Sequence, residues 1–202
     1  MTRLFVGSFL REDQAAAFRS IDQELKSTPI AKLHITWLFL GELSPEQVLE
    51  AKDCFTHLGR AIAEARIKPF DIVYNNLELW PAATPHVGVL TPQDPADEVA
   101  SVAKLVRLHL GAFEENRDKA MPFRPHLTAI RFRERDGSDG KRKMIPSLVS
   151  VENELLKLLP VVQTIQSIDL IESSQARTSE ASQHTTQANR THSYKSIAAI
   201  KL

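Results

Sequence analysis

The chain alternates strand-like and helix-like segments in an order that repeats once, and this order restricts the fold more than any other feature. The second copy begins near residue 77. The predicted strands are 3–10, 33–40, 70–80, 86–90, 124–132, 164–173 and 193–202, and the predicted helices are 11–27, 44–65, 96–113 and 147–159. Such an order indicates an α+β fold with two similar lobes, each with an antiparallel sheet and helices on its outer face.

No Pro/Gly-rich linker and no sharp change of composition divides the chain, so we expect residues 1–202 to form a single domain with interleaved lobes. One stretch departs from the pattern. Residues 173–192 are rich in Ser, Thr and Gln and have no apolar face. We interpret this stretch as a long exposed loop between the last two strands.

Composition excludes several functional classes. Lys plus Arg and Asp plus Glu number 25 each, so no global charge indicates nucleic-acid binding. The sequence has no uninterrupted apolar stretch of the length that a bilayer requires, and no membrane association is expected. A single cysteine excludes an internal disulfide and a thiolate-rich zinc site, as is typical of a cytoplasmic protein.

Histidine is the residue type left to carry chemistry, because phosphate-binding glycine loops, the dinucleotide fingerprint, zinc-protease helices and serine nucleophile elbows are absent. The pattern His-x-Thr occurs three times, beginning at His34, His126 and His184. His184 lies in the polar stretch and is expected at a solvated surface. The other two lie in predicted strands, where residues i and i+2 share a face, so each histidine projects beside its threonine.

Two such pairs facing one another suit attack on a phosphodiester. One neutral imidazole takes a proton from water while the other, protonated, donates one to the leaving oxygen, and both have pKa values naturally near neutrality. The hydroxyls of Thr36 and Thr128 can donate to the non-bridging oxygens. No metal and no other cofactor is required. A buried structural histidine remains the alternative for each motif taken alone.

A local basic run surrounds the second motif. Residues 117–143 contain nine Lys or Arg and four Asp or Glu, an excess that the neutral total conceals. Arg124 shares the strand face of His126. Arg131, five residues after that histidine, faces the opposite side in a regular strand unless a bulge reverses it. Either arginine is a candidate phosphate ligand, and the cluster 141–143 is a candidate rim for a nucleic-acid backbone.

With these motifs the sequence resembles the two-histidine phosphoesterases, specifically the RNA 2′,3′-cyclic phosphodiesterases also described as 2′-5′ RNA ligase-like proteins. The resemblance rests on "LHITWLFLGEL", on "FRPHLTAIR", on the first strand "RLFVGSFL" and on the closing pair of strands, and it spans nearly the whole chain. It departs from the usual pattern at Trp37, at Ala129 and Ile130, and in the polar loop.

The resemblance implies a bilobal fold with a central groove and metal-independent opening of a 2′,3′-cyclic phosphate to a 2′-phosphate. By position, His34 would donate the proton to the leaving 3′ oxygen and His126 would activate water. Thr36 and Thr128 would bind phosphate. The residues themselves do not distinguish which histidine is the acid and which is the base, and these two roles come only from the resemblance. The substrate-binding candidates are Arg124, Arg131 and Phe39.

The expected partners are RNA 3′ ends or small cyclic nucleotides, bound by a monomer. Two alternatives stay open at this point. One is a binding module for RNA or tRNA ends without turnover. The other is a phosphodiesterase acting on a small nucleotide, such as a cyclic ADP-ribose phosphate or a 2′-5′ oligoadenylate.

Overall fold

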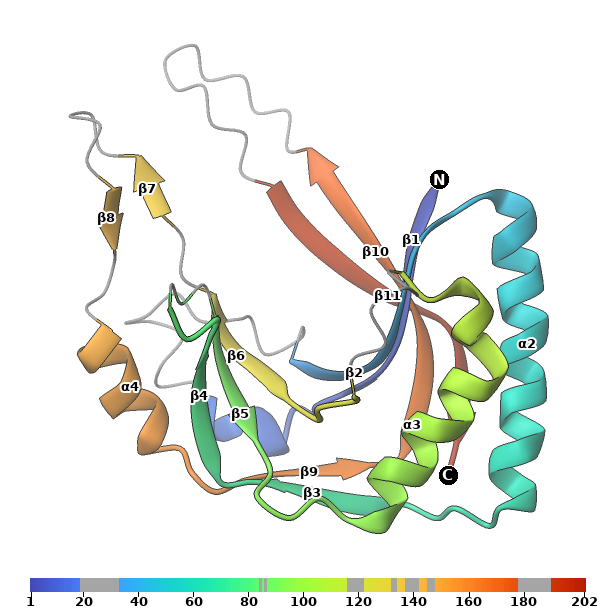
Figure 1. The fold of residues 1–202 in the computed structure, drawn as a ribbon, viewed down its shortest axis with the longest axis horizontal. Helices are drawn as coiled ribbons and strands as arrows, with labels where there is room; N and C mark the ends of the chain where they lie inside the picture. The colour runs from blue at the N-terminus through green and yellow to red at the C-terminus, as the bar shows by residue number, and fades with distance from the viewer. Residues whose placement is uncertain are drawn as a thin grey trace.

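The fold is α+β, and the described part of the chain forms a large antiparallel sheet, two small sheets and three α-helices (Figure 1). The computed structural model describes residues 1–18, 33–83, 85, 87–115, 122–131, 134–136, 142–144, 148–177 and 190–202. The strands are β1 Thr2–Phe9, β2 His34–Leu43, β3 Phe70–Tyr74, β4 Asn76–Trp80, β5 Val87–Thr91, β6 Leu127–Arg131, β7 Glu134–Asp136, β8 Arg142–Met144, β9 Val161–Ile165, β10 Ser167–Arg177 and β11 Arg190–Lys201. The helices are α2 Pro45–Glu64, α3 Asp97–Leu110 and α4 Leu148–Leu156, with 3-10 turns η1 Gln14–Phe18 and η3 Gly111–Phe113.

Seven strands form the large sheet in the order β11-β10-β1-β2-β6-β5-β4. Its two halves meet at one register pair, Ile35 of β2 with Leu127 of β6, and neighbouring strands are antiparallel. The α+β prediction is confirmed. The predicted division into two lobes with a sheet each is not confirmed, because the large sheet is continuous across this junction and β3 pairs with β9 in a separate sheet.

The helices form where the sequence supplies caps and an apolar face. Ser44 caps α2: its hydroxyl accepts the backbone N–H of Gln47, and the Gln47 side chain accepts the N–H of Ser44. Pro45 occupies the first turn, where its missing N–H costs no hydrogen bond. In α3, buried valines and a leucine recur at a helical spacing and pack into the core against β2. Helix α2 packs against α3 and contacts β2 and β11, α3 contacts β2, and α4 lies near β4 (Figure 1).

The chain changes sheet at Asn75, which the sequence analysis placed inside one strand from 70 to 80. The buried hydroxyl of Tyr74 donates to Gln163 on β9 at 2.7 Å, which fixes the end of β3. The Asn75 side chain accepts the backbone N–H of Gln93 at 2.8 Å, and the chain then continues as β4 beside β5. The apolar run is therefore divided at Asn75 into two strands that belong to different sheets.

Other segments also differ from the sequence predictions or fall partly outside the described residues, and one of them is the strand expected at 164–173, which divides into the end of β9 and β10 in different sheets. Of the helix expected at 11–27, the described part contains only the 3-10 turn η1, and 19–27 lie outside. The polar run 133–143, which the sequence predicts as a loop, contains the paired strands β7 and β8, and residues 133 and 137–141 lie outside the described residues. The loop expected at 173–192 is wrong at both ends: β10 and β11 stay paired as far as Arg177 and Arg190, and 178–189 lie outside.

The described part of the chain contains no helix long and apolar enough to cross a membrane.

Candidate active site

The register of the central strand pair joins the two His-x-Thr motifs. Ile35 lies opposite Leu127 and both side chains are fully buried. In an antiparallel pair this register sets His34 opposite Thr128 and Thr36 opposite His126, all on the other face of the sheet. Facing Cβ atoms in such pairs are about 5 Å apart and diagonal ones roughly 7 to 8 Å. All four polar side chains are half-buried. The structure therefore brings together the four residues that the sequence analysis selected as catalytic.

A bulge follows the threonine of the first motif. Thr36 lies opposite Gly7 and Leu38 lies opposite Val6, so Trp37 is an extra residue on β2. Gly7 is required at this point because a Cβ there would lie 2.8 Å from the Ile35 carbonyl oxygen. The close approach of β1 to β2 thus depends on a glycine opposite the motif.

The second motif is followed by the same irregularity. Thr128 lies opposite Val89 and Ile130 lies opposite Gly88, which leaves Ala129 as the extra residue on β6. Both motifs therefore share one backbone device, a bulge at the residue after the threonine.

The two bulges decide where the predicted ligands Phe39 and Arg131 point. Five residues after its histidine, each of them would face the core side of a regular strand. Each bulge adds one residue to its strand, so every later side chain points to the face opposite the one expected for a regular strand. The burial of the side chains agrees with this change of face. The two residues after each threonine are buried, whereas Phe39 is 49% exposed and Arg131 is exposed. Both ligand candidates thus lie on the face that carries the motifs.

His126 is held in one orientation. Its Nδ1 lies 2.8 Å from the backbone carbonyl oxygen of Arg124, a geometry in which the ring N–H donates to the carbonyl and Nε2 keeps its lone pair. The Trp80 ring lies 4.7 Å away between centroids. Burial lowers the pKa of His126 below its usual value, and the cationic Arg124 and Arg131 act in the same direction. The hydrogen bond to the carbonyl and the carboxylate of Glu78 oppose this shift without cancelling it.

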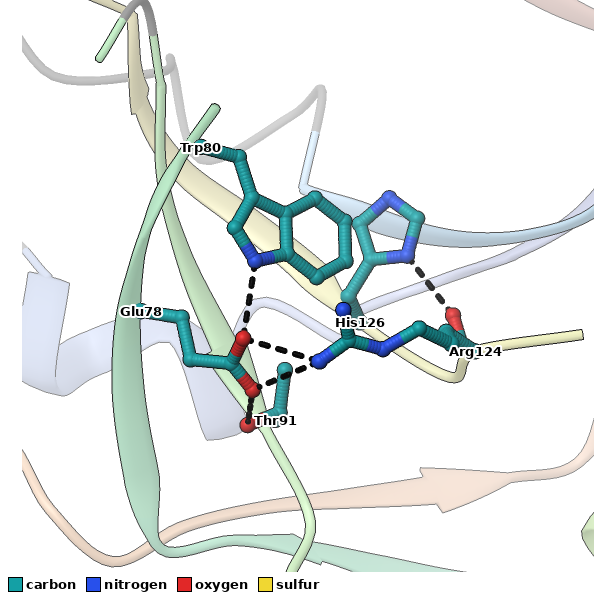
Figure 2. A network of polar contacts seen from close by, with 5 residues as sticks. All are labelled: Glu78, Trp80, Thr91, Arg124 and His126. Carbon is teal, nitrogen blue, oxygen red and sulfur yellow. Dashed lines mark hydrogen bonds and ion pairs between the residues drawn. The ribbon is translucent and has the colours of Figure 1, made fainter. Parts of the chain in front are cut away.

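A carboxylate that the sequence analysis missed organises this side of the site. Figure 2 shows Glu78 of β4 accepting hydrogen bonds from the Trp80 indole (2.8 Å), the Thr91 hydroxyl (2.9 Å) and the Arg124 guanidinium (2.8 and 3.0 Å). The guanidinium carbon of Arg124 also lies 4.8 Å from the centroid of the Trp80 ring. Burial raises the pKa of Glu78, but the hydrogen bonds from these three partners and the charge of Arg124 outweigh it, so the pKa is lowered and the group is ionised.

The predicted phosphate ligand Arg124 is therefore engaged by Glu78 through its Nη2 atom. Glu78 and Trp80 were not selected from the sequence. The one signal for them was their spacing of two within a short apolar strand, which puts both side chains on one face of β4. Their partner Arg124 is distant in sequence, and nothing local in the pattern indicates the pairing.

His34 has aromatic surroundings. Its ring centroid lies 4.9 Å from that of Phe5, 6.0 Å from Phe9 and 5.1 Å from Tyr194, the last in an edge-on arrangement. Tyr194, on β11, was also not anticipated, because its strand is separated from β2 by two others in the sheet. The two histidines thus differ in their surroundings: aromatic rings enclose His34, whereas His126 lies beside one indole, a carboxylate and two cations.

A cavity of about 1140 Å³ opens beside the strand junction. Four of the predicted site residues line it: Thr36, Phe39, Arg124 and His126. The described lining residues do not include His34, Thr128 or Arg131, which lie farther along the same face of the sheet. The cavity is bounded on its other side by α3 and by the segment after η3.

Within the described ranges, no group of three or more His, Cys, Asp or Glu side chains is close enough to hold a metal ion. The expectation of metal-independent chemistry stays a prediction. Of the basic cluster 141–143, residue 141 lies outside the described residues and the other two belong to β8.

No protein-family model and no curated protein matches the sequence. Solved structures do match the fold. A phosphoesterase covers 100% of this chain and 99% of its own length, with a TM-score of 0.64 and 18% identity. Protein TT0787 of Thermus thermophilus matches with a TM-score of 0.65 and 21% identity, and the match covers 99% of this chain and 97% of that protein. E. coli LigT complexed with 3′-AMP matches with a TM-score of 0.64 and 19% identity, and the match covers 100% of this chain and 98% of LigT.

LigT has also been crystallised with ATP, with NADP⁺ and with phosphate. At these identities the likeness concerns the fold, and at that level the resemblance expected from the two motifs is confirmed. The chain shares the fold of this phosphoesterase and of E. coli LigT.

Proposed function

We propose that this chain hydrolyses the 2′,3′-cyclic phosphate at an RNA 3′ end to a 2′-phosphate, with the two His-x-Thr motifs as the catalytic groups. The observation that carries the proposal is the pairing of Ile35 with Leu127, which aligns both motifs on one face of adjacent strands. Two imidazoles and two hydroxyls around one small volume match the needs of an in-line displacement at phosphorus.

His126 is the general base in this proposal. Its Nδ1–H is committed to the Arg124 carbonyl, so Nε2 is the nitrogen that accepts a proton. Because burial lowers its pKa below the usual 6.5, the ring is neutral at pH 7. The water oxygen bonds to phosphorus, and the water proton passes to Nε2 of His126.

His34 is the general acid. As the bond from phosphorus to the 3′ oxygen breaks, His34 protonates that oxygen, and the products are a 3′-hydroxyl and a 2′-phosphate. One water is consumed, and proton exchange with solvent restores both histidines. The hydroxyls of Thr36 and Thr128 donate to the non-bridging oxygens, and the exposed Arg131 adds positive charge on the same face. The exposed ring of Phe39 offers apolar surface to the ribose or the base.

The nucleotide and phosphate complexes of E. coli LigT support a phosphate ester as the ligand of this fold. They leave open the size of the substrate. A small cyclic nucleotide is therefore the comparison substrate in the experiments below.

The first test is turnover of an oligoribonucleotide ending in a 2′,3′-cyclic phosphate, with and without EDTA. We expect hydrolysis that EDTA does not reduce and a product whose phosphate remains on the 2′ oxygen, as read by ³¹P NMR. A 3′-phosphate product would contradict the assigned leaving group. Binding of the oligonucleotide without turnover between pH 5 and 9 would favour a binding module instead.

Trp80→Ala tests the assignment of His126 as the base. Removing the indole exposes the imidazole to water, so the pKa of His126 should rise toward 6.5. A base must be unprotonated to act, and the acidic limb of kcat/KM against pH should therefore move to higher pH. Trp80→Phe retains an aromatic ring and should leave the limb near its original position. An unchanged limb in Trp80→Ala would mean that another group titrates there.

A further inference from the structure

The cavity beside the catalytic face extends to α3. One side of this helix lines it with residues spaced by three or four: Ala100, Ala103, Lys104 and Arg107. The same cavity is lined by Thr36 and His126. A ligand bound at His126 therefore has continuous space toward α3.

Among the charged side chains that line this space, the carboxylates are paired with arginines, and one lysine is not paired with a carboxylate of the described residues. Each of the carboxylates that line the cavity lies in an ion pair with an arginine: Glu78 with Arg124, Glu114 with Arg107, and Glu115 with Arg3. Lys104 differs, because its exposed side chain forms no hydrogen bond or ion pair with any residue in the described ranges. The α3 end of the cavity thus presents one ammonium group whose charge these neighbours leave uncompensated.

The volume also exceeds what one small ligand needs. Cavities that enclose drug-sized molecules measure roughly 300 to 1000 Å³, and this one measures about 1140 Å³. A nucleic-acid chain with its terminal phosphate at His126 has its next phosphate one nucleotide away. An ammonium group on a flexible stem is suited to such a phosphate, since it acts as a point charge with three rotatable donors.

We propose that the α3 end of the cavity is a second phosphate subsite, in which Lys104 binds the phosphate on the 5′ side of the terminal nucleotide. The proposal rests on the proposed function and narrows it: the preferred substrate carries a second phosphate. That phosphate belongs either to a phosphodiester of an oligonucleotide or to the 5′ end of a single nucleotide. Both sources present the same anion to Lys104.

Three substrates separate these sources: a nucleoside 2′,3′-cyclic phosphate, the same compound with a 5′-phosphate, and a dinucleotide ending in the cyclic phosphate. For each, kcat/KM is measured for the parent protein and for Lys104→Ala. We expect the parent to prefer the two substrates with a second phosphate, and Lys104→Ala to reduce that preference roughly tenfold, as for loss of one charged hydrogen bond. The preference of the parent should also weaken as salt concentration rises.

Lys52→Ala is the matched control, because Lys52 is an exposed lysine on α2 that does not line the cavity. It should retain the parent's preference, and Lys104→Arg should retain most of it. An unchanged preference in Lys104→Ala would overturn the subsite. A preference reduced only for the dinucleotide would mean that α3 binds a nucleoside and not a phosphate.

Calorimetry tests the subsite without turnover. The parent should bind a nucleoside 3′,5′-bisphosphate more tightly than the 3′-monophosphate, and Lys104→Ala should lose this difference. If no substrate is hydrolysed but the difference is present and depends on Lys104, the proposed function fails and the subsite stands. Equal affinities in the parent would overturn the subsite, whatever the kinetics.

Discussion

His126→Ala and His34→Ala should each reduce kcat on a cyclic-phosphate oligonucleotide by about 10² to 10⁴-fold, the usual contribution of a general acid or base. The double variant should lose much less than the product of the two factors, because residues that act as a unit are not additive. Thermal unfolding should stay close to that of the parent, since both side chains are only half-buried on the open face of the sheet.

A matched control exists in the same sequence. His184 heads the third His-x-Thr pattern and lies outside the described residues, and His184→Ala should keep full activity. A phosphodiester with a nitrophenolate leaving group separates the two roles, because this leaving group needs no proton. On that ester His34→Ala should recover most of the lost rate, while His126→Ala should not. The reverse pattern would exchange the acid and the base, and retention of activity by either alanine variant would contradict the proposed mechanism.

Trp37→Ala should destabilise the protein by about 3 to 5 kcal/mol, the cost of truncating a large buried aromatic residue. Trp37 is the bulge residue of β2 and is 4% exposed. Its indole donates to the Ser8 hydroxyl at 2.9 Å, and its ring stacks on Phe123 with centroids 5.5 Å apart. Phe123 lies in the segment that leads into His126. Loss of this stack therefore removes both core packing and a support of the second motif.

Urea denaturation measures this effect. Trp37→Phe keeps an aromatic ring against Phe123 and should cost only about 1 kcal/mol for the lost hydrogen bond, which preserves the test if the alanine variant fails to fold. Leu49→Ala on α2 is the control, because Leu49 is 64% exposed and its truncation should change stability by less than about 0.5 kcal/mol. A loss below about 1 kcal/mol for Trp37→Ala would contradict a structural role for the bulge residue.

Periodicity was sufficient to predict the strands and helices whose faces differ in polarity. Both ends of α2 and the start of β2 were predicted to within one residue, because a Ser-Pro helix start and apolar alternation are local signals, whereas β2 continues three residues beyond its predicted end. Periodicity did not decide which face of the sheet the Arg131 side chain points to, because the bulge at Ala129 is defined by the pairing of β6 with β5. A register shift is a property of two strands, and one strand's sequence does not contain it.

The hydrogen bonds of Glu78 likewise depend on residues from other segments and could not be predicted from its own strand. Its partners Arg124 and Thr91 come from other segments, and only the folded sheet brings them to one carboxylate. The error at 173–177 and 190–192 has a different cause. Backbone hydrogen bonds continue the β10–β11 pair where the side chains are polar, so the lack of an apolar face does not end a strand.

The junction at Ile35 and Leu127 has a consequence for the order of folding. The hairpins β4–β5 and β10–β11 join segments near one another in sequence, whereas the junction closes a loop of roughly ninety residues, which carries a larger entropic cost. Because closing this loop costs more entropy than closing a hairpin, we expect the two motifs to meet only after the local hairpins exist. Recovery of activity during refolding should therefore lag behind the far-ultraviolet circular dichroism signal.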